Sequence, residues 1–216
     1  MRRIMIAACG LLVMGVAGFA QTGQGGAQVP TITYLEGTAT IDGTEARIGD
    51  TVPLGAVVVT SPGSFVDIEF NTRNAIRLSE DTTFVFNPRN LQTGSELRKG
   101  ALTLVLKRIS AGQSGPAFLI RTPSAVAGVR GTSFFMKVES QTSTYVCACN
   151  GVVQVLGSDG SLLKELAGSH HNGARIQAAG GAPRLTDAPL LYHTDADLER
   201  VAAAIGYKID WNVVDR

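Results

Sequence analysis

The chain has 216 residues, of which 44% are hydrophobic, 17% are charged and 6% are aromatic, and its formal net charge is +1. The apolar fraction is too high for a disordered chain, and the composition excludes a coiled coil, in which Ala, Glu, Lys, Leu and Arg make up about half of the residues. A net charge so close to zero argues against nucleic acid as a partner, and the length suits one large domain.

The first 20 residues have the pattern of a secretory signal peptide. Arg2 and Arg3 supply the positive charge, an uncharged apolar run follows, and small residues up to Ala20 provide a cleavage site. An uncleaved anchor is the alternative, but the apolar run is at the short end of the about 17–25 residues that a membrane span needs. We expect a flexible tether at 21–29 and a periplasmic or secreted protein with no stable membrane span after cleavage.

From residue 30 to about 176, the chain consists of short β-rich runs separated by turn residues. Examples are 57–60, 66–70, 83–86 and 102–106. In the second run, Val66, Ile68 and Phe70 alternate with Asp67 and Glu69, which is the period of a strand with one buried face. Strands at this spacing, with no amphipathic helix between them, predict a mainly β protein built as a sandwich or barrel.

One helix is expected near the C-terminus, at about 195–205. Thr194 is a suitable N-cap, Asp197 is placed to complete a capping box, and Gly206 follows where helices often end. An apolar face with helical spacing is formed by Leu198, Val201, Ala202 and Ile205. These residues predict a short helix that packs across one end of the β domain.

Residues 120–138 read IRTPSAVAGVRGTSFFMKV, and this segment resembles the signature of the FecR family of periplasmic domains. The residues that carry the resemblance are Pro123, Gly128, Arg130, Gly131 and Thr132. The resemblance implies a jelly-roll-like β-sandwich over 30–157, so the expected fold class is mainly β with a short C-terminal helix. Residues 158–216 would then form an extension with a hairpin, a histidine-containing loop and the helix.

In the best-known FecR proteins, the domain is the periplasmic part of a transmembrane signalling protein that senses an outer-membrane transporter and controls a sigma factor. Here only three residues precede the apolar run, so we expect no cytoplasmic anti-sigma segment and do not carry that function over. The resemblance instead implies an exported, non-catalytic binding or interaction domain with a regulatory or sensing role. Its partner would be a protein or a small ligand in the cell envelope.

Several signature residues have a structural role that follows from their chemistry. Proline disfavours helical backbone at the preceding residue, so Pro123 predicts an extended chain at Thr122. Gly128 and Gly131 permit close backbone contact or positive φ. Arg130 has two interpretations, because it could lock the turn by pairing with a carboxylate or carbonyl groups, or it could bind a ligand.

After signal cleavage, the remaining two cysteines and all three histidines lie within residues 147–193. They are Cys147, Cys149, His170, His171 and His193. Thiolate and imidazole are ligands that suit zinc, copper or iron, so these five residues are a candidate transition-metal site. Two alternatives stay open: a redox-active or strained disulfide between Cys147 and Cys149, and purely structural roles. Adjacent histidines on an extended chain point to opposite sides, so His170 and His171 need not both bind.

The pair Asn150-Gly151 is a strong signal for a two-residue hairpin turn. Such a turn would place Cys149 opposite Val152 and leave both cysteines on the less apolar face, available to ligands from later loops. The opposite face would be the core face, with Val146, Ala148, Val153 and Val155.

The sequence carries no recognisable catalytic motif. Residues 128–133 lack the length and the lysine of a phosphate-binding loop, and no G-x-S-x-G segment occurs. We therefore predict that the protein is not an enzyme, and that it has no catalytic residues and no cofactor-binding residues besides the candidate metal site.

Overall fold

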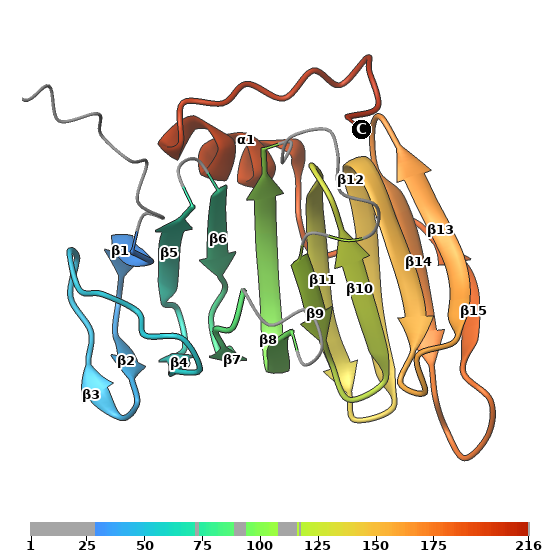
Figure 1. Ribbon diagram of the computed structural model, residues 1–216, viewed down its shortest axis with the longest axis horizontal. Helices are drawn as coiled ribbons and strands as arrows, with labels where there is room; N and C mark the ends of the chain where they lie inside the picture. Colours follow the sequence, from blue (N-terminus) through green and yellow to red (C-terminus); the bar gives the residue numbers. More distant parts are fainter. Residues whose placement is uncertain (1–28, 72–73, 89–93, 108–115, 117, 216) are drawn as a thin grey trace, which may run out of the picture.

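The computed structural model describes residues 29–71, 74–88, 94–107, 116 and 118–215, and Figure 1 shows their arrangement. The predicted signal peptide at 1–20 and the tether at 21–29, apart from Val29, lie outside these residues. The described chain forms fifteen strands and one short helix near the C-terminus. The predicted class, mainly β with a short C-terminal helix, is confirmed.

The strands form two sheets that share two long strands. The first sheet has the order β1 (Thr31–Glu36), β5 (Phe65–Phe70), β6 (Asn74–Leu78), β8 (Ser95–Leu106), β11 (Ser133–Ser140), β12 (Ser143–Gly157), β14 (Asn172–Gln177) and β15 (Arg184–Ala188). The second has the order β3 (Thr44–Glu45), β2 (Ala39–Ile41), β4 (Val57–Thr60), β7 (Thr83–Val85), β8, β9 (Phe118–Arg121), β10 (Ala125–Val129), β12 and β13 (Leu162–Gly168). Paired strands are antiparallel, except that β8 and β9 are parallel.

The two shared strands each pass from one sheet to the other at a glycine with positive φ. Gly100 (φ 85°) begins the part of β8 that pairs in the first sheet, and Gly151 (φ 122°) begins the part of β12 that pairs in the second. A Cβ atom at Gly100 would lie 2.5 Å from Thr82 Cα, and one at Gly151 would lie 3.0 Å from Thr132 Cα. Because only glycine suits both the backbone and the space, these positions determine where the sheets join.

The hairpin turn predicted at Asn150-Gly151 is wrong, because β12 continues through both residues without reversing. Asn150 still pairs with Ser133 in the first sheet, whereas Gly151 pairs with Gly168 in the second. An Asn-Gly pair indicates backbone that can adopt positive φ, and here the chain uses that freedom to bend between sheets. Cys149 therefore does not face Val152 across a turn.

One face of each sheet contributes to the main hydrophobic core, so the core lies between the two sheets. Fully buried members include Ile68, Phe134 and Val146 from the first sheet, and Phe84, Ile120 and Val153 from the second. All four residues predicted for the core face around the cysteines belong to this core, namely Val146, Ala148, Val153 and Val155. Two layers packed in this way fit the expected sandwich.

A second, smaller core lies on the outer face of the first sheet, where α1 (Asp195–Ala204) packs (Figure 1). The predicted helix start is confirmed, since the N–H and the hydroxyl of Thr194 both donate to Asp197 Oδ2 at 2.8 Å. Gly206 (φ 64°) follows the helix in the left-handed conformation. The apolar face of the helix is buried against the sheet, as predicted. Its residues are Leu198, Val201, Ala202 and Ile205.

Candidate functional site

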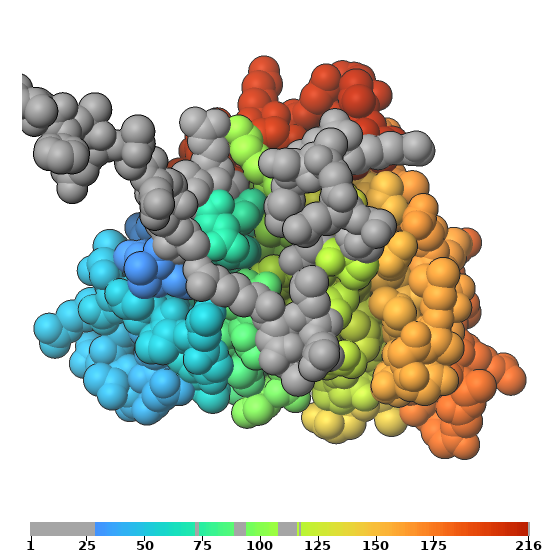
Figure 2. Space-filling model, viewed as in Figure 1, coloured from blue at the N-terminus to red at the C-terminus, as the bar shows by residue number. Residues whose placement is uncertain are grey.

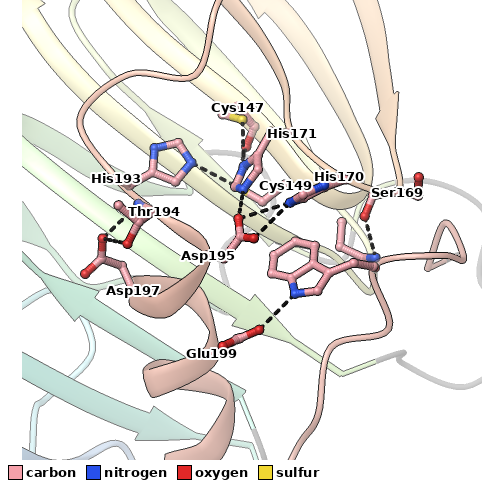
Figure 3. Close-up of polar contacts among 12 residues, drawn as sticks. Cys147, Cys149, Ser169, His170, His171, His193, Thr194, Asp195, Asp197 and Glu199 are labelled. Carbon is pink, nitrogen blue, oxygen red and sulfur yellow. Dashed lines mark hydrogen bonds and ion pairs between the residues drawn. The ribbon is translucent and has the colours of Figure 1, made fainter.

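Cys147 and Cys149 lie on the outer face of β12, within the second core, and both are fully buried free thiols (Figure 3). They do share the face directed away from the main core, as their spacing predicts. The expectation that this face is less apolar and accessible is wrong. Its cover comes from α1 and the chain after it, including Ile209 and Trp211, which no local pattern around the cysteines could reveal.

His171 connects one thiol to the start of α1. Its Nδ1 lies 3.6 Å from Cys147 Sγ, and its Nε2 lies 2.6 Å from Asp195 Oδ1. Because a carboxylate can only accept, the Nε2–H donates to Asp195, and Nδ1 is the ring nitrogen directed at the sulfur. The His171 side chain is only 7% exposed.

His193 approaches the other thiol from the chain between β15 and α1. Its Nε2 lies 3.2 Å from Cys149 Sγ, and its Nδ1–H donates to the Leu191 carbonyl oxygen at 2.7 Å. The ring also stacks on Phe135, with 4.3 Å between centroids and 12° between planes. Packing and hydrogen bonding therefore hold this buried imidazole in one orientation and one tautomer.

His170 lies outside the thiol group. Its half-exposed ring contacts Asp195 through Nε2 at 3.0 Å and lies 4.9 Å from the Trp211 ring. The expectation that His170 and His171 point to opposite sides is wrong, because His171 has left-handed backbone (φ 49°) and both imidazoles reach Asp195. Of the five predicted residues, four therefore meet around the thiols, and His170 lies at the rim.

Two residues without a glycine's freedom adopt positive φ beside this group. They are His171 (φ 49°) and Tyr192 (φ 68°), which directly precedes His193. Left-handed backbone costs about 1–2 kcal/mol for such residues. The backbone conformation that brings both imidazoles to the thiols is therefore locally unfavourable, and packing and hydrogen bonds around it must stabilise it.

The protonation of the group reflects these contacts. The hydrogen bond from Cys149, followed by those from both histidines, holds the pKa of Cys147 well below its usual range. Burial raises the pKa of Cys149, and the nearby Cys147 sulfur raises it further. Burial opposes charge on His171, but its bonds to Cys147 and Asp195 outweigh that effect and raise its pKa. The lowered pKa of Cys147 and the raised pKa of His171 together favour a Cys147 thiolate beside a protonated imidazole.

The order Cys147, His171, Asp195 has the form of a nucleophile, a base and an orienting carboxylate. Cys147 is, however, completely buried under the second core, so a substrate has no path to its sulfur. The arrangement suits a small ion that reaches atoms already directed inward, and it does not favour catalysis on a larger substrate.

The chain that carries His193 is anchored at two points on the first sheet. The Tyr145 hydroxyl donates to the Pro189 carbonyl and accepts from the Leu191 N–H, at 3.0 and 3.2 Å. Further along, the Tyr192 hydroxyl donates to Glu139 Oε1 at 2.8 Å. These contacts fix the segment before α1, and hence the position of the imidazole.

Protonating Glu139 is expected to loosen this anchor. Bonds from Arg175, Ser143 and Tyr192 outweigh the effect of burial and lower the pKa of Glu139 to about 2. The carboxylate has an unfolded pKa of about 4.3, so its stabilisation is complete above that pH and disappears as pH falls through the folded value. Because Arg175 is partly exposed, we expect about 1–2 kcal/mol. Urea unfolding between pH 5 and 2 should show a steeper loss in the wild type than in Glu139→Gln.

The matched control is Asp187→Asn, which removes the exposed partner of Lys164. This variant should lose stability with falling pH as steeply as the wild type does. Equal pH profiles for the wild type and Glu139→Gln would contradict the role given to Glu139.

The FecR-like signature residues lie apart from the thiol group, around β10. Pro123 occupies the tight turn between β9 and β10, where the Thr122 N–H donates to the Ala125 carbonyl at 2.8 Å. Gly131 has positive φ (60°), and a Cβ at Gly128 would lie 3.1 Å from Pro116 Cβ. These residues shape the backbone.

Thr132 is fully buried and ties the signature to β12, since its hydroxyl donates to the Val152 carbonyl at 2.9 Å. Arg130 instead lines a surface groove of about 320 Å³, together with Pro116, Gln154 and Glu165. In Figure 2, the yellow-green residues of β9 and β10 lie beside the orange-yellow residues of β12 and β13 on this face.

Sequence patterns missed two groups that orient the imidazoles at the thiols. They are the Asp195 carboxylate and the Leu191 carbonyl. Asp195 is the first residue of α1, where an acidic residue is common. Its role in orienting His171 is therefore visible only from their contact in the structure. A backbone carbonyl has no sequence signal.

Comparison with known proteins gives one family match and two similar structures. Residues 56–154 match the family described as FecR protein. No curated protein matches the chain. Two crystal structures of candidate anti-sigma factors from Parabacteroides distasonis ATCC 8503, at 1.65 and 2.50 Å resolution, have TM-scores of 0.48 and 0.47 and identities of 16% and 17%. Each alignment covers 61% of this chain and 59% of the other, so the chain spans less than two thirds of either protein.

The matched region contains β4 to β11 and most of β12, and with them the five signature residues and both thiols. His170, His171 and His193 lie beyond its end. The match therefore agrees with the resemblance in the signature segment, and residues 56–154 of this chain are similar to the FecR family.

Proposed function

We propose that this protein is an exported, non-catalytic domain of the FecR type that acts in the cell envelope by binding a partner, in a regulatory or sensing role. The family match supports a regulatory domain over an enzyme. The pattern of residues 1–20 supports export. Over the described part of the chain, no helix combines the length and the apolar character that a membrane span requires.

The observation that carries the proposal is the position of Arg130 on the surface groove. The other signature residues shape backbone or pack inside, whereas Arg130 adds a long cationic side chain to the groove lining. Arg130 and Glu165 give the groove side chains of opposite charge. We therefore expect a protein partner whose docking segment presents polar or charged groups over the groove, next to Gln154.

Site-specific photo-crosslinking tests this proposal. The full chain, with a photoreactive residue in place of Gln154, is expressed in intact cells and irradiated. It should give one discrete crosslinked product. Arg130→Ala should reduce that product at least tenfold, because the groove would lose its cationic side chain and the charge pattern that the docking segment recognises. The same preparation tests export, since the mature chain in the envelope fraction should begin at Gln21.

Two controls distinguish binding from misfolding. Arg184→Ala removes an exposed arginine on β15 and should leave the product unchanged. A photoreactive residue at exposed Glu45, on β3, should give no such product. If Arg130→Ala keeps its Tm and crosslinks as the wild type does, the groove is not the partner site.

A further inference from the structure

We propose that Cys147, Cys149, His171 and His193 bind one Zn²⁺ ion with four protein ligands, and that the ion fastens the C-terminal part of the chain to the first sheet. One ligand atom from each residue is available, and these atoms all lie within 4.8 Å of one another. This inference goes beyond the proposed partner binding and does not depend on it, because the groove and the thiols lie at different places.

The distances agree with tetrahedral zinc. With zinc–sulfur bonds of about 2.3 Å and zinc–nitrogen bonds of about 2.0–2.1 Å, adjacent sulfur and nitrogen ligands lie about 3.6 Å apart. Cys147 Sγ and His171 Nδ1 are 3.6 Å apart, and Cys149 Sγ and His193 Nε2 are 3.2 Å apart. Small side-chain movements would place all four atoms around one ion.

The second set of contacts points independently to a metal. A metal-binding histidine usually donates its other ring N–H to a carboxylate or a backbone carbonyl, which fixes the tautomer and the orientation. His171 does so with Asp195, and His193 does so with the Leu191 carbonyl. In both rings, the nitrogen that does not make this bond is the one directed at a thiol.

The surroundings also suit a structural zinc site. Both thiols are fully buried, and His193 is 6% exposed, so four protein ligands would surround the ion without an open position for substrate. His170 is not part of this set, because its half-exposed ring rests on Asp195 outside the thiols. That arrangement makes His170 a matched control for its neighbour.

The ligands come from three separate parts of the chain. Both cysteines lie on β12, His171 lies just before β14, and His193 lies just before α1. The ion would therefore close two long loops, and its binding free energy would add to folding. It would also protect two thiols from oxidation in an exported protein.

Metal content and metal binding of the full chain test the proposal. Protein purified without chelators should contain about one zinc per chain and no thiols that react with a thiol reagent until a chelator is added. Cys147→Ser and His193→Ala should retain less than a tenth of the zinc, whereas His170→Ala should retain all of it. After metal removal, added Zn²⁺ should change the fluorescence of Trp211, the single tryptophan, because its ring lies 5.4 Å from that of His171.

A second measurement covers the case in which a cysteine variant fails to fold. Co²⁺ added to the metal-free wild type should give intense tetrahedral bands and a thiolate charge-transfer band, and one equivalent of Zn²⁺ should abolish both. A Cys147–Cys149 disulfide in the native protein, a wild type that binds no zinc, or equal zinc loss in His170→Ala and Cys147→Ser would each overturn the proposal. Stoichiometric copper or iron in place of zinc in the protein as purified would overturn the choice of ion.

Discussion

Replacing Arg77 by methionine is expected to lower the free energy of unfolding by about 3–5 kcal/mol. Arg77 on β6 and Asp67 on β5 face each other across the strands, and both are buried. The guanidinium donates through Nε and Nη2 to the two carboxylate oxygens, each at 2.6 Å. Without Arg77, the Asp67 carboxylate would remain in the protein interior with no opposite charge, which is the costly state.

Urea unfolding of three further variants separates this cause from others. The double variant Asp67→Leu with Arg77→Met should recover most of the loss, because no charge is then left buried. Arg98→Met removes the partner of Glu96, whose side chain is 46% exposed, and should change stability by less than about 1 kcal/mol. If Arg77→Met lowers the free energy of unfolding no more than Arg98→Met does, the buried pair contributes no more to stability than the exposed pair.

Asn150→Ala is expected to cost about 2–4 kcal/mol and to release the C-terminal segment after α1. The Asn150 side chain is buried, and its amide nitrogen lies 2.9–3.0 Å from the carbonyl oxygens of Ser169, Asp210 and Val213, so its two N–H groups are shared among three acceptors. Its oxygen accepts from the Asp215 N–H at 3.3 Å. Alanine would leave these backbone groups without a partner where water has little access.

Hydrogen exchange is the sharpest measurement, because the loss should be local as well as global. Amides at 207–215 should exchange faster in Asn150→Ala, while those of β5 and β6 should change only with global stability. Asn172→Ala is the matched control, since its amide makes a single exposed bond to the Ala167 carbonyl. If the 207–215 amides keep their protection in Asn150→Ala, the segment is held by apolar packing alone.

The proposed zinc ligands join two parts of the chain that differ in their relation to the family. Both cysteines lie inside the FecR match, whereas both histidines come from the chain after it. Asn150 makes the same connection, since it lies inside the match and bonds to residues 210–215. With zinc bound, the C-terminal part would be fastened to the matched region at two neighbouring places on β12.

Much of the fold was predictable because its signals are local. A strand alternates its faces with period two, so Val66, Ile68 and Phe70 could be assigned to the core before any partner strand was known. The helix start is equally local, because the capping box at Thr194 and Asp197 involves residues three apart. The same period correctly separated Cys147 and Cys149 from the main core.

What the patterns could not decide is what covers each outer face. Asp67 has the alternation of an exposed residue, yet it is buried, and its burial is tolerated because Arg77 pairs with it from the next strand. The thiol face was expected to be open, yet α1 closes it from more than forty residues away in sequence.

The amino-acid sequence alone determined the strand-rich class, the helix with its cap, the family resemblance and the five thiol and imidazole residues. The tertiary structure alone decided that Asn150-Gly151 joins two sheets, that four of the five residues meet, and that Asp195 orients one of them. The physical reason is range: backbone preference and side-chain period act over a few residues. A contact such as Cys149 with His193 depends on how distant segments pack together.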